Sequence, residues 1–146
     1  MFKNILVPVD GSNSSWKALA YAKELAEKFE GKLTVLTVAQ VYRSATLVAM
    51  PLDNVFNAQD DGITESSKLV IESAKEKLTD FHGTVEYLLE KGHPSEKILS
   101  IAKNENSGFD AIIIGSRGLS GIAEFFLGSV SAKVAEHSKI PVVIVK

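Results

Sequence analysis

Residues 5–12, which read ILVPVDGS, set the architecture expected for this chain. The first five of them, 5–9, form a nearly continuous apolar run, which is typical of a strand that is buried on both faces of a parallel sheet. Gly11, Ser12, Asn13 and Ser14 then break the run and offer several oxygens that can cap a following helix. The segment therefore predicts a strand, a turn and a helix, in that order.

The rest of the chain repeats this alternation. Further strands are predicted at 33–38, 85–89, 111–114 and 142–145, and apolar residues recur at helical spacing within 18–29, 63–81, 98–102 and 130–137. Gly31 is predicted to cap the first helix and Gly83 to end the second, whereas residues 40–62 lack a clean period and are predicted to form a long loop. Asn104–Gly108 is predicted as a shorter loop. Five strands alternating with four helices predict an α/β fold, a mostly parallel sheet with helices on both faces, in one domain spanning residues 1–146.

Composition narrows the possible functions. The 146 residues are 45% hydrophobic and 23% charged, which is ordinary for one globular domain. A net charge of −2 provides no basic field for a phosphate backbone, so nucleic-acid binding is not expected. Cysteine is absent, which excludes disulfide scaffolds, thiolate zinc sites and cysteine nucleophiles. The histidines show no metal-ligand spacing.

Hydropathy bears on location. The apolar stretch before Asp10 is shorter than a secretory signal requires, and no window approaches the roughly 18 apolar residues of a membrane helix. We therefore expect a soluble, cytoplasmic protein without a membrane partner.

The carboxyl ends of the predicted strands are the expected ligand site, because open parallel sheets bind ligands there, where the strand order reverses. The fourth strand leads into Gly115, Gly118, Gly121 and Gly128. Glycines let a ligand approach the backbone, and their amides together with a helix N-terminus at Ser129 form an anion site. This chemistry suits a polyphosphate, although tight turns with close helix–sheet packing are the alternative explanation.

The glycine spacing is neither that of a Walker A loop nor that of the dinucleotide fingerprint G-x-G-x-x-G. Instead, Gly115-x2-Gly118-x9-Gly128-Ser129 matches the G-2x-G-9x-G-(S/T) pattern and resembles the ATP-binding branch of the universal stress proteins. Residues 5–12 resemble that family's first strand and turn, 92–94 its glycine-x-proline turn, and 141–145 its closing strand. The similarity covers nearly the whole chain and is weakest over 40–62.

This resemblance implies a five-stranded sheet in the order 3-2-1-4-5, similar to the Rossmann-like adenine nucleotide alpha-hydrolase fold. It implies that Pro8, Val9 and Asp10 line an adenosine pocket, that Val38 holds adenine through its backbone, that Gly115 and Gly118 contact ribose and phosphates, and that Gly128, Ser129 and Val130 hold the distal phosphates. Mg²⁺ would lie on the phosphates rather than in a protein cage. Gly121, Ser116 and Arg117 are further candidates from the loop. Arg117 either donates hydrogen bonds to a phosphate or is a solvated side chain, and Ser116 is either a ligand contact, a phosphorylation position or a solvated loop residue.

The sequence favours binding over turnover, because no set of nucleophile, base and orienting group can be assembled and the loop carries no lysine. The expected function is a nucleotide-dependent stress or metabolic sensor with at most slow ATP hydrolysis. Three alternatives stay open: a phosphoryl- or adenylyl-transfer enzyme, a dimeric interaction module with another ligand, and a flavin-binding flavodoxin-like protein. An apolar edge strand at 142–145 predicts a homodimer that pairs through it, as does the resemblance.

Overall fold

The computed structural model describes residues 1–40, 52–119 and 127–146, with residues 52–64 described only as helix backbone. The strands are β1 (Asn4–Pro8), β2 (Lys32–Ala39), β3 (Val85–Lys91), β4 (Ala111–Gly115) and β5 (Val142–Val145). The helices are α1 (Asn13–Phe29), α2 (Leu52–Lys77), α3 (Pro94–Lys103) and α4 (Ser129–His137), with one 3₁₀ turn, η2 (Glu105–Ser107), inside the loop predicted at Asn104–Gly108.

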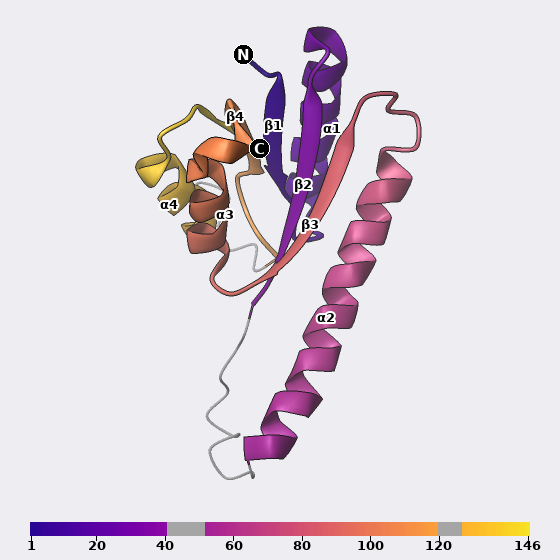
Figure 1. Ribbon diagram of the computed structural model, residues 1–146, viewed down its shortest axis with the longest axis vertical. Helices are drawn as coiled ribbons and strands as arrows, with labels where there is room; N and C mark the ends of the chain where they lie inside the picture. The colour runs from indigo at the N-terminus through magenta and orange to yellow at the C-terminus, as the bar shows by residue number, and fades with distance from the viewer. Residues whose placement is uncertain (41–51, 120–126) are drawn as a thin grey trace.

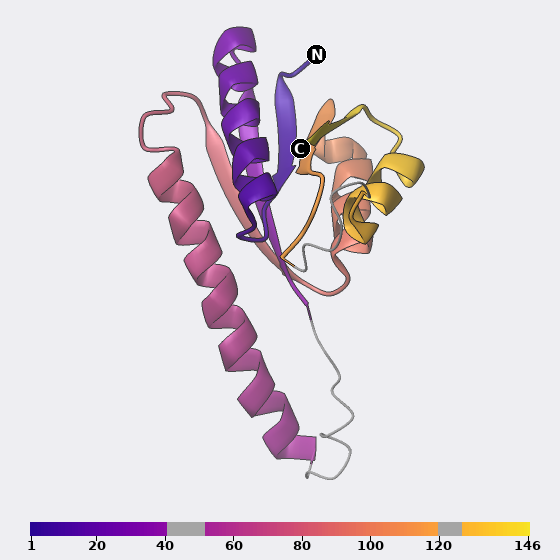
Figure 2. The same ribbon diagram turned by 180° about the vertical axis from the view of Figure 1, so that it is seen from behind.

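The five strands form one parallel sheet in the order β3-β2-β1-β4-β5, which confirms the predicted fold class. β1 is central, with Ile5 in register with Leu33 on β2 and with Ala111 on β4. Helices α1 and α2 cover one face of the sheet, and α3 and α4 cover the other (Figures 1 and 2). The reversal of strand order therefore falls between β1 and β4.

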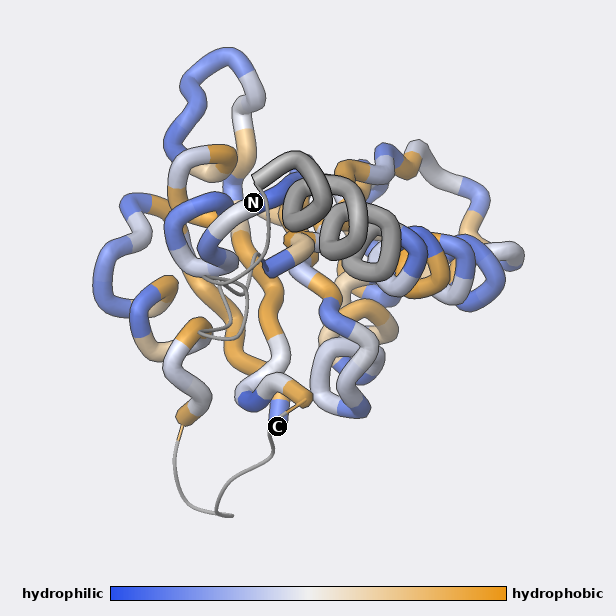
Figure 3. The backbone as a smooth tube through the Cα atoms, turned by 90° about the horizontal axis from the view of Figure 1, so that it is seen from below, coloured by the Kyte–Doolittle hydropathy of each residue, from blue (hydrophilic) through white to orange (hydrophobic). Residues whose placement is uncertain are grey.

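The sheet is buried on both faces because its side chains alternate between two cores. On β1, Ile5 and Val7 pack with α1 and α2, whereas Leu6 packs with α3 and α4. All three are fully buried. Figure 3 shows the same layering, with predominantly hydrophobic strands between helices that carry hydrophilic residues.

The end of α1 differs from the prediction that Gly31 caps it. The C-cap is Glu30, which adopts the left-handed conformation with φ 52° and donates its amide to the carbonyl of Ala26. Gly31 is required for another reason: a Cβ there would lie 2.2 Å from the carbonyl oxygen of Phe2. The glycine lets the N-terminal segment pass close to the helix end.

The second helix is longer than predicted, and the loop expected over residues 40–62 is wrong for 52–62. Helix α2 has 26 residues, about 39 Å at 1.5 Å per residue, and its first half extends past the carboxyl ends of the strands (Figure 1). Its second half is anchored by buried Ile71 and Ala74. Because adding a residue to an existing helix gains a hydrogen bond, an interior glycine such as Gly62, which costs about 1 kcal/mol, is tolerated. The helix also ends at Lys77, before the glycine predicted to end it.

Residues 41–51 of that predicted loop lie outside the described residues. In the part of the chain that the structure describes, no helix combines the length and the apolar character needed to cross a bilayer.

Candidate functional site

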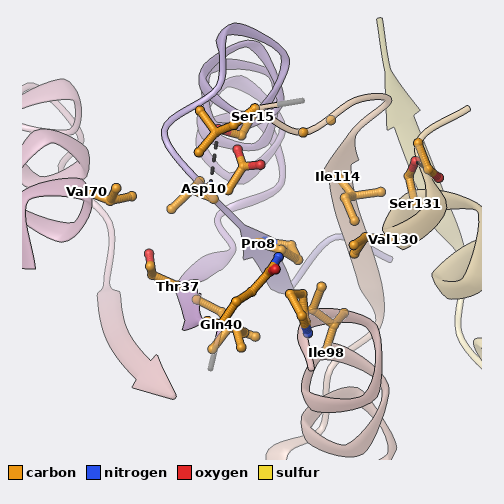
Figure 4. A pocket seen from close by; sticks show the side chains of 18 of the residues that line it. Pro8, Asp10, Ser15, Thr37, Gln40, Val70, Ile98, Ile114, Val130 and Ser131 are labelled. Atoms are coloured by element: carbon orange, nitrogen blue, oxygen red, sulfur yellow. Dashed lines mark hydrogen bonds between the residues drawn. The ribbon is translucent and has the colours of Figure 1, made fainter. Parts of the chain in front are cut away.

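A cavity of about 810 Å³ opens at the carboxyl ends of β1, β2 and β4 (Figure 4). It lies at the reversal of strand order, where ligands bind in open parallel sheets. Helix α2 borders it on one side and α3 and α4 on the other. The lining residues are Pro8, Val9, Asp10, Ser15, Leu36, Thr37, Val38, Ala39, Gln40, Ser66, Ser67, Val70, Pro94, Ile98, Ile114, Gly115, Arg117, Gly118, Leu119, Gly128, Ser129, Val130 and Ser131.

The backbone of β2 offers polar groups to this cavity. The amide of Val9 donates to the carbonyl of Leu36 at 2.8 Å, and the amide of Gly92 donates to the carbonyl of Ala39 at 3.0 Å. Even-numbered residues at this end of β2 therefore turn their backbone groups toward β1, and odd-numbered residues turn theirs toward β3. By this alternation the N–H and C=O of Val38 point to the β1 side. Within the described residues the bonds between β1 and β2 end before Val38, so a donor and an acceptor lie side by side in the cavity.

Asp10 is fixed by the turn that follows β1. One carboxylate oxygen, Oδ1, accepts the amide of Ser12 at 3.0 Å, an Asx turn. The amide of Asp10 donates to the hydroxyl of Ser15 at 3.4 Å, the bond drawn in Figure 4. The other oxygen, Oδ2, lies toward the loop after β4, because a Cβ on Gly118 would be 3.0 Å from it. The turn thus places a carboxylate at the cavity wall, opposite a glycine.

The start of α1 holds the first part of the loop. The Ser14 hydroxyl accepts the amide of Arg117 at 3.3 Å and donates to the carbonyl of the same residue. The Ser12 hydroxyl donates to that carbonyl at 3.3 Å. Gly115 packs directly on α1: a Cβ there would lie 2.6 Å from the carbonyl carbon of Ser14 and 2.7 Å from the amide nitrogen of Ser15. Because both atoms belong to backbone, only glycine fits.

The start of α4 holds the end of the loop. The amide of Gly128 donates to the carbonyl of Ser116 at 2.7 Å, and the Ser131 hydroxyl lies 3.0 Å from the same carbonyl and 2.9 Å from that of Gly128. Gly128 is the N-cap of α4 and provides no side-chain cap. The amides of the first helical turn, including those of Ser129 and Val130, have no acceptor within the helix and adjoin the cavity. They form a ready site for an anion.

Most residues singled out from the sequence meet at this cavity. Its lining includes Pro8, Val9, Asp10, Val38, Gly115, Arg117, Gly118, Gly128, Ser129 and Val130. Ser116 is not among the lining residues: it is 5% exposed, and its backbone ties the loop to β5 and α4. Gly121 lies outside the described residues.

Other lining residues escaped the sequence analysis. Thr37 precedes Val38 on β2 and Gln40 follows the end of that strand, whereas Ser66, Ser67 and Val70 come from α2. The position of Thr37 and Gln40 beside Val38 was a usable signal. Nothing in the helical period of α2 indicates that it borders the ligand site, because amphipathic spacing shows which face is buried but not what adjoins it.

The described part of the lining is nearly balanced in charge, with one carboxylate on Asp10 and one cation on Arg117. Across the described residues there is no group of three or more histidine, aspartate or glutamate side chains that could hold a metal ion. The site is thus built mainly from backbone amides, hydroxyls and apolar side chains, which suits a neutral ring joined to an anionic group.

Comparisons with known proteins point in one direction. The model of the universal stress protein family matches residues 1–146. Universal stress protein YxiE of Bacillus subtilis is 36% identical over 153 aligned positions, covering all of both chains. The solved structure of MJ0577, a universal stress protein of Methanocaldococcus jannaschii, has a TM-score of 0.83 at 32% identity and covers 100% of this chain and 96% of its own. A universal stress protein solved in complex with cAMP has a TM-score of 0.70 at 26% identity, covering 99% and 97% of the two chains.

Proposed function

This chain belongs to the universal stress protein family, and from that membership and the cavity we propose that it binds ATP as a nucleotide-dependent sensor of the family's ATP-binding branch. The observation that carries the proposal is the pairing of two features in one cavity. The backbone groups of Val38 lie at one end, and the glycine loop that leads into α4 lies at the other. A base linked through a sugar to phosphates needs both.

The base end is suited to adenine. Its Watson–Crick edge presents an acceptor, N1, beside a donor, the N6 amine, which complements the N–H and C=O of Val38. Guanine presents the reverse, a ring N–H beside a carbonyl oxygen. Binding guanine would leave the donor and the acceptor of Val38 unpaired, with a loss of roughly 1–3 kcal/mol for each buried group. The geometry therefore favours adenine.

The phosphate end is suited to a flexible anionic chain. Gly118 leaves room where a Cβ would press on Asp10, and the amides of Ser129 and Val130 supply donors at a helix N-terminus. Arg117 supplies a charge-assisted donor. One arginine balances only part of a triphosphate's charge, so we propose that Mg²⁺ accompanies the nucleotide, held by its phosphates and by water.

Slow hydrolysis is the second candidate, and the observation that favours it is the Asp10 carboxylate beside the loop. The described lining provides no lysine and no second carboxylate to stabilise phosphoryl transfer, so any turnover is slow. ADP or AMP that accumulates with time in the wild type, but not in Asp10→Ala, would establish an enzyme. Nucleotide that is bound and recovered intact supports a sensor.

We also propose that the protein is a homodimer paired through β5, and that it acts in the cytoplasm. β5 is an edge strand. The amide of Ser116 donates to the carbonyl of Val145, so the backbone groups of the odd-numbered residues face β4 and those of Val142 and Ile144 face outward. Antiparallel pairing with a second copy would satisfy them. Sedimentation should give the mass of two chains for the wild type and of one for Val142→Pro, which removes an outward N–H; a wild-type monomer would refute the pairing.

Thermal unfolding tests the nucleotide proposal. A ligand that binds only the folded state adds about 2.7 kcal/mol to the free energy of unfolding at 100 times its Kd. For a domain of this size, ATP with Mg²⁺ should therefore raise the Tm by several degrees. GTP with Mg²⁺ at the same concentration should raise it much less. Equal effects of the two nucleotides, or none, would count against adenine recognition at Val38.

A further inference from the structure

Gln40 lies at the base end of the cavity, directly after the last residue of β2 and two residues beyond Val38. Its side chain is half-buried and lines the cavity, and Figure 4 shows it directed back across the site toward Pro8. No partner for its amide is found among the described residues. A donor and an acceptor in one planar group are thus available to a ligand.

The direction of β2 determines which part of an adenine lies nearest Gln40. Along a strand, the N–H of a residue precedes its C=O. With N1 on the N–H of Val38 and the N6 amine on its C=O, N6 lies nearer the carboxyl end of β2 than N1. On the ring, N7 follows N6 on the side away from N1. The Hoogsteen edge, formed by the second N6 hydrogen and N7, therefore faces the end of β2, where Gln40 stands.

We infer that Gln40 recognises the Hoogsteen edge of the base and so determines specificity for adenine, an inference that rests on the proposed function. Its Oε1 accepts the second N6 hydrogen and its Nε2 donates to N7. A glutamine amide and this edge of adenine form a matched bidentate pair. With Val38 on one edge and Gln40 on the other, both hydrogens of the N6 amine are bound.

The pairing also explains a difference between the two sides of the cavity. Near the glycine loop the donors are backbone amides and Arg117, which suit anions and do not distinguish bases. Beside Gln40 the lining side chain of Thr37 is polar and uncharged (Figure 4). Neutral donors and acceptors match the edge of a neutral heterocycle. We therefore expect this end of the cavity to distinguish adenine from other bases.

The test replaces N7 in the ligand and the Gln40 side chain in the protein, separately and together. Binding of ATP and of 7-deaza-ATP, in which a C–H replaces N7, is measured by calorimetry with Mg²⁺ for the wild type, Gln40→Leu and Gln40→Glu. The wild type should bind 7-deaza-ATP roughly 5- to 10-fold more weakly than ATP, the effect of one hydrogen bond. In Gln40→Leu the two nucleotides should bind equally, each more weakly than ATP binds the wild type. Gln40→Glu keeps an acceptor for N6 but turns a second acceptor toward N7, so it should bind 7-deaza-ATP at least as tightly as ATP.

Three results would overturn the inference. Equal affinities in the wild type would show that N7 is not bound, while ATP binding itself would stand. A 7-deaza penalty that persists in Gln40→Leu would place the N7 partner elsewhere. Absence of binding of either nucleotide to the wild type would refute the proposed function and the role of Gln40 with it. The melting temperatures of the three unliganded proteins should agree, because the Gln40 amide has no partner in the described part of the chain whose loss would change stability.

Discussion

A Cβ atom on Gly118 would lie 3.0 Å from Oδ2 of Asp10. The loop after β4 and the turn after β1 are therefore in contact at the reversal of strand order, with a carboxylate on one side and bare backbone on the other. A ligand that enters between them meets the amides of α4 without a side chain at position 118 in its path. Because of this contact, substitutions of Gly118 test most directly whether the site binds a ligand.

Gly118→Asp should abolish measurable ATP binding, because it places a second carboxylate against Asp10 and where the phosphates are proposed to lie. Gly118→Asn has nearly the same bulk without the charge and should bind ATP with an intermediate affinity. Gly118→Ala should weaken binding least, since a 3.0 Å contact is relieved by a small rotation of the Asp10 side chain. Calorimetry with Mg²⁺·ATP measures the series, and circular dichroism checks that each variant is folded. Equal affinities across the series would show that the phosphates do not bind at this loop.

Gly115→Ala should lower the free energy of unfolding, not merely affinity. Its Cβ would lie 2.6 Å from the carbonyl carbon of Ser14 and 2.7 Å from the amide of Ser15, both in the backbone of α1. Such overpacking costs typically 1–3 kcal/mol, since a helix end cannot move aside as a side chain can. Urea unfolding without nucleotide measures the loss, with Gly118→Ala as the matched control. Equal midpoints for the two variants would contradict the close approach of β4 and α1.

Two buried hydroxyls at the cavity should behave in opposite ways. Ser131 is 2% exposed and its hydroxyl bonds the loop, so Ser131→Ala should lose about 1 kcal/mol of stability and weaken ATP binding. Thr37 is 3% exposed, and its hydroxyl has no partner in the part of the chain that the structure describes. Thr37→Val preserves shape and should leave the free energy of unfolding unchanged or slightly higher. A larger loss in Thr37→Val than in Ser131→Ala would refute this assignment of partners.

The ion pair between Lys23 on α1 and Asp80 after α2 should make stability depend on pH. The hydrogen bond from Lys23, at 2.5 Å, is the main cause that holds the pKa of Asp80 below its usual 3.8, and the same bond raises the pKa of Lys23 above 10.5. A carboxyl with a depressed pKa stabilises the fold above its unfolded pKa and ceases to do so as the pH falls through the folded value. The lysine contribution is present below its unfolded pKa and disappears as the pH rises through the folded value.

Wild type and Asp80→Asn should accordingly differ in urea midpoint at neutral pH, with the wild type more stable. The difference should shrink as the pH falls below 3.8 and as salt is added, because the Asp80 carboxylate is exposed to solvent. A difference that is constant from neutral to strongly acidic pH would show that the bond contributes through packing and not through charge.

The fold was predictable wherever local pattern and tertiary context agree. The apolar run of β1 and the strict alternation of elements were sufficient for the α/β class, and the strand order followed from the resemblance. The predictions are wrong where tertiary contacts, and not the local sequence, determine the ends of helices. Glu30 and not Gly31 takes the left-handed cap, while Gly31 is needed where the chain passes Phe2. Helix α2 starts at Leu52 because a helix that is anchored at one end extends through residues of low helix propensity.

The residues of the site that belong to local sequence motifs could be predicted, whereas those brought to it by tertiary packing could not. The glycine spacing and the turn at Asp10 are local signals, and the structure brings them to one cavity. Val70 and Ser67 of α2 reach the same cavity only through the packing of that helix on β2, which no spacing records. Ser116, a residue of the loop, is buried and contributes its backbone, whose carbonyl accepts the Ser131 hydroxyl, and it is not among the residues that line the cavity.

We propose that the cavity between Val38 and α4 binds one ATP. Calorimetric titration of nucleotide-free protein with ATP and Mg²⁺, beside Gly118→Asp as the matched control, tests it most directly. The wild type should show saturable binding of one ATP per chain, and the control should lose it. No heat from the wild type, together with no displacement of a fluorescent ATP analogue, would contradict it.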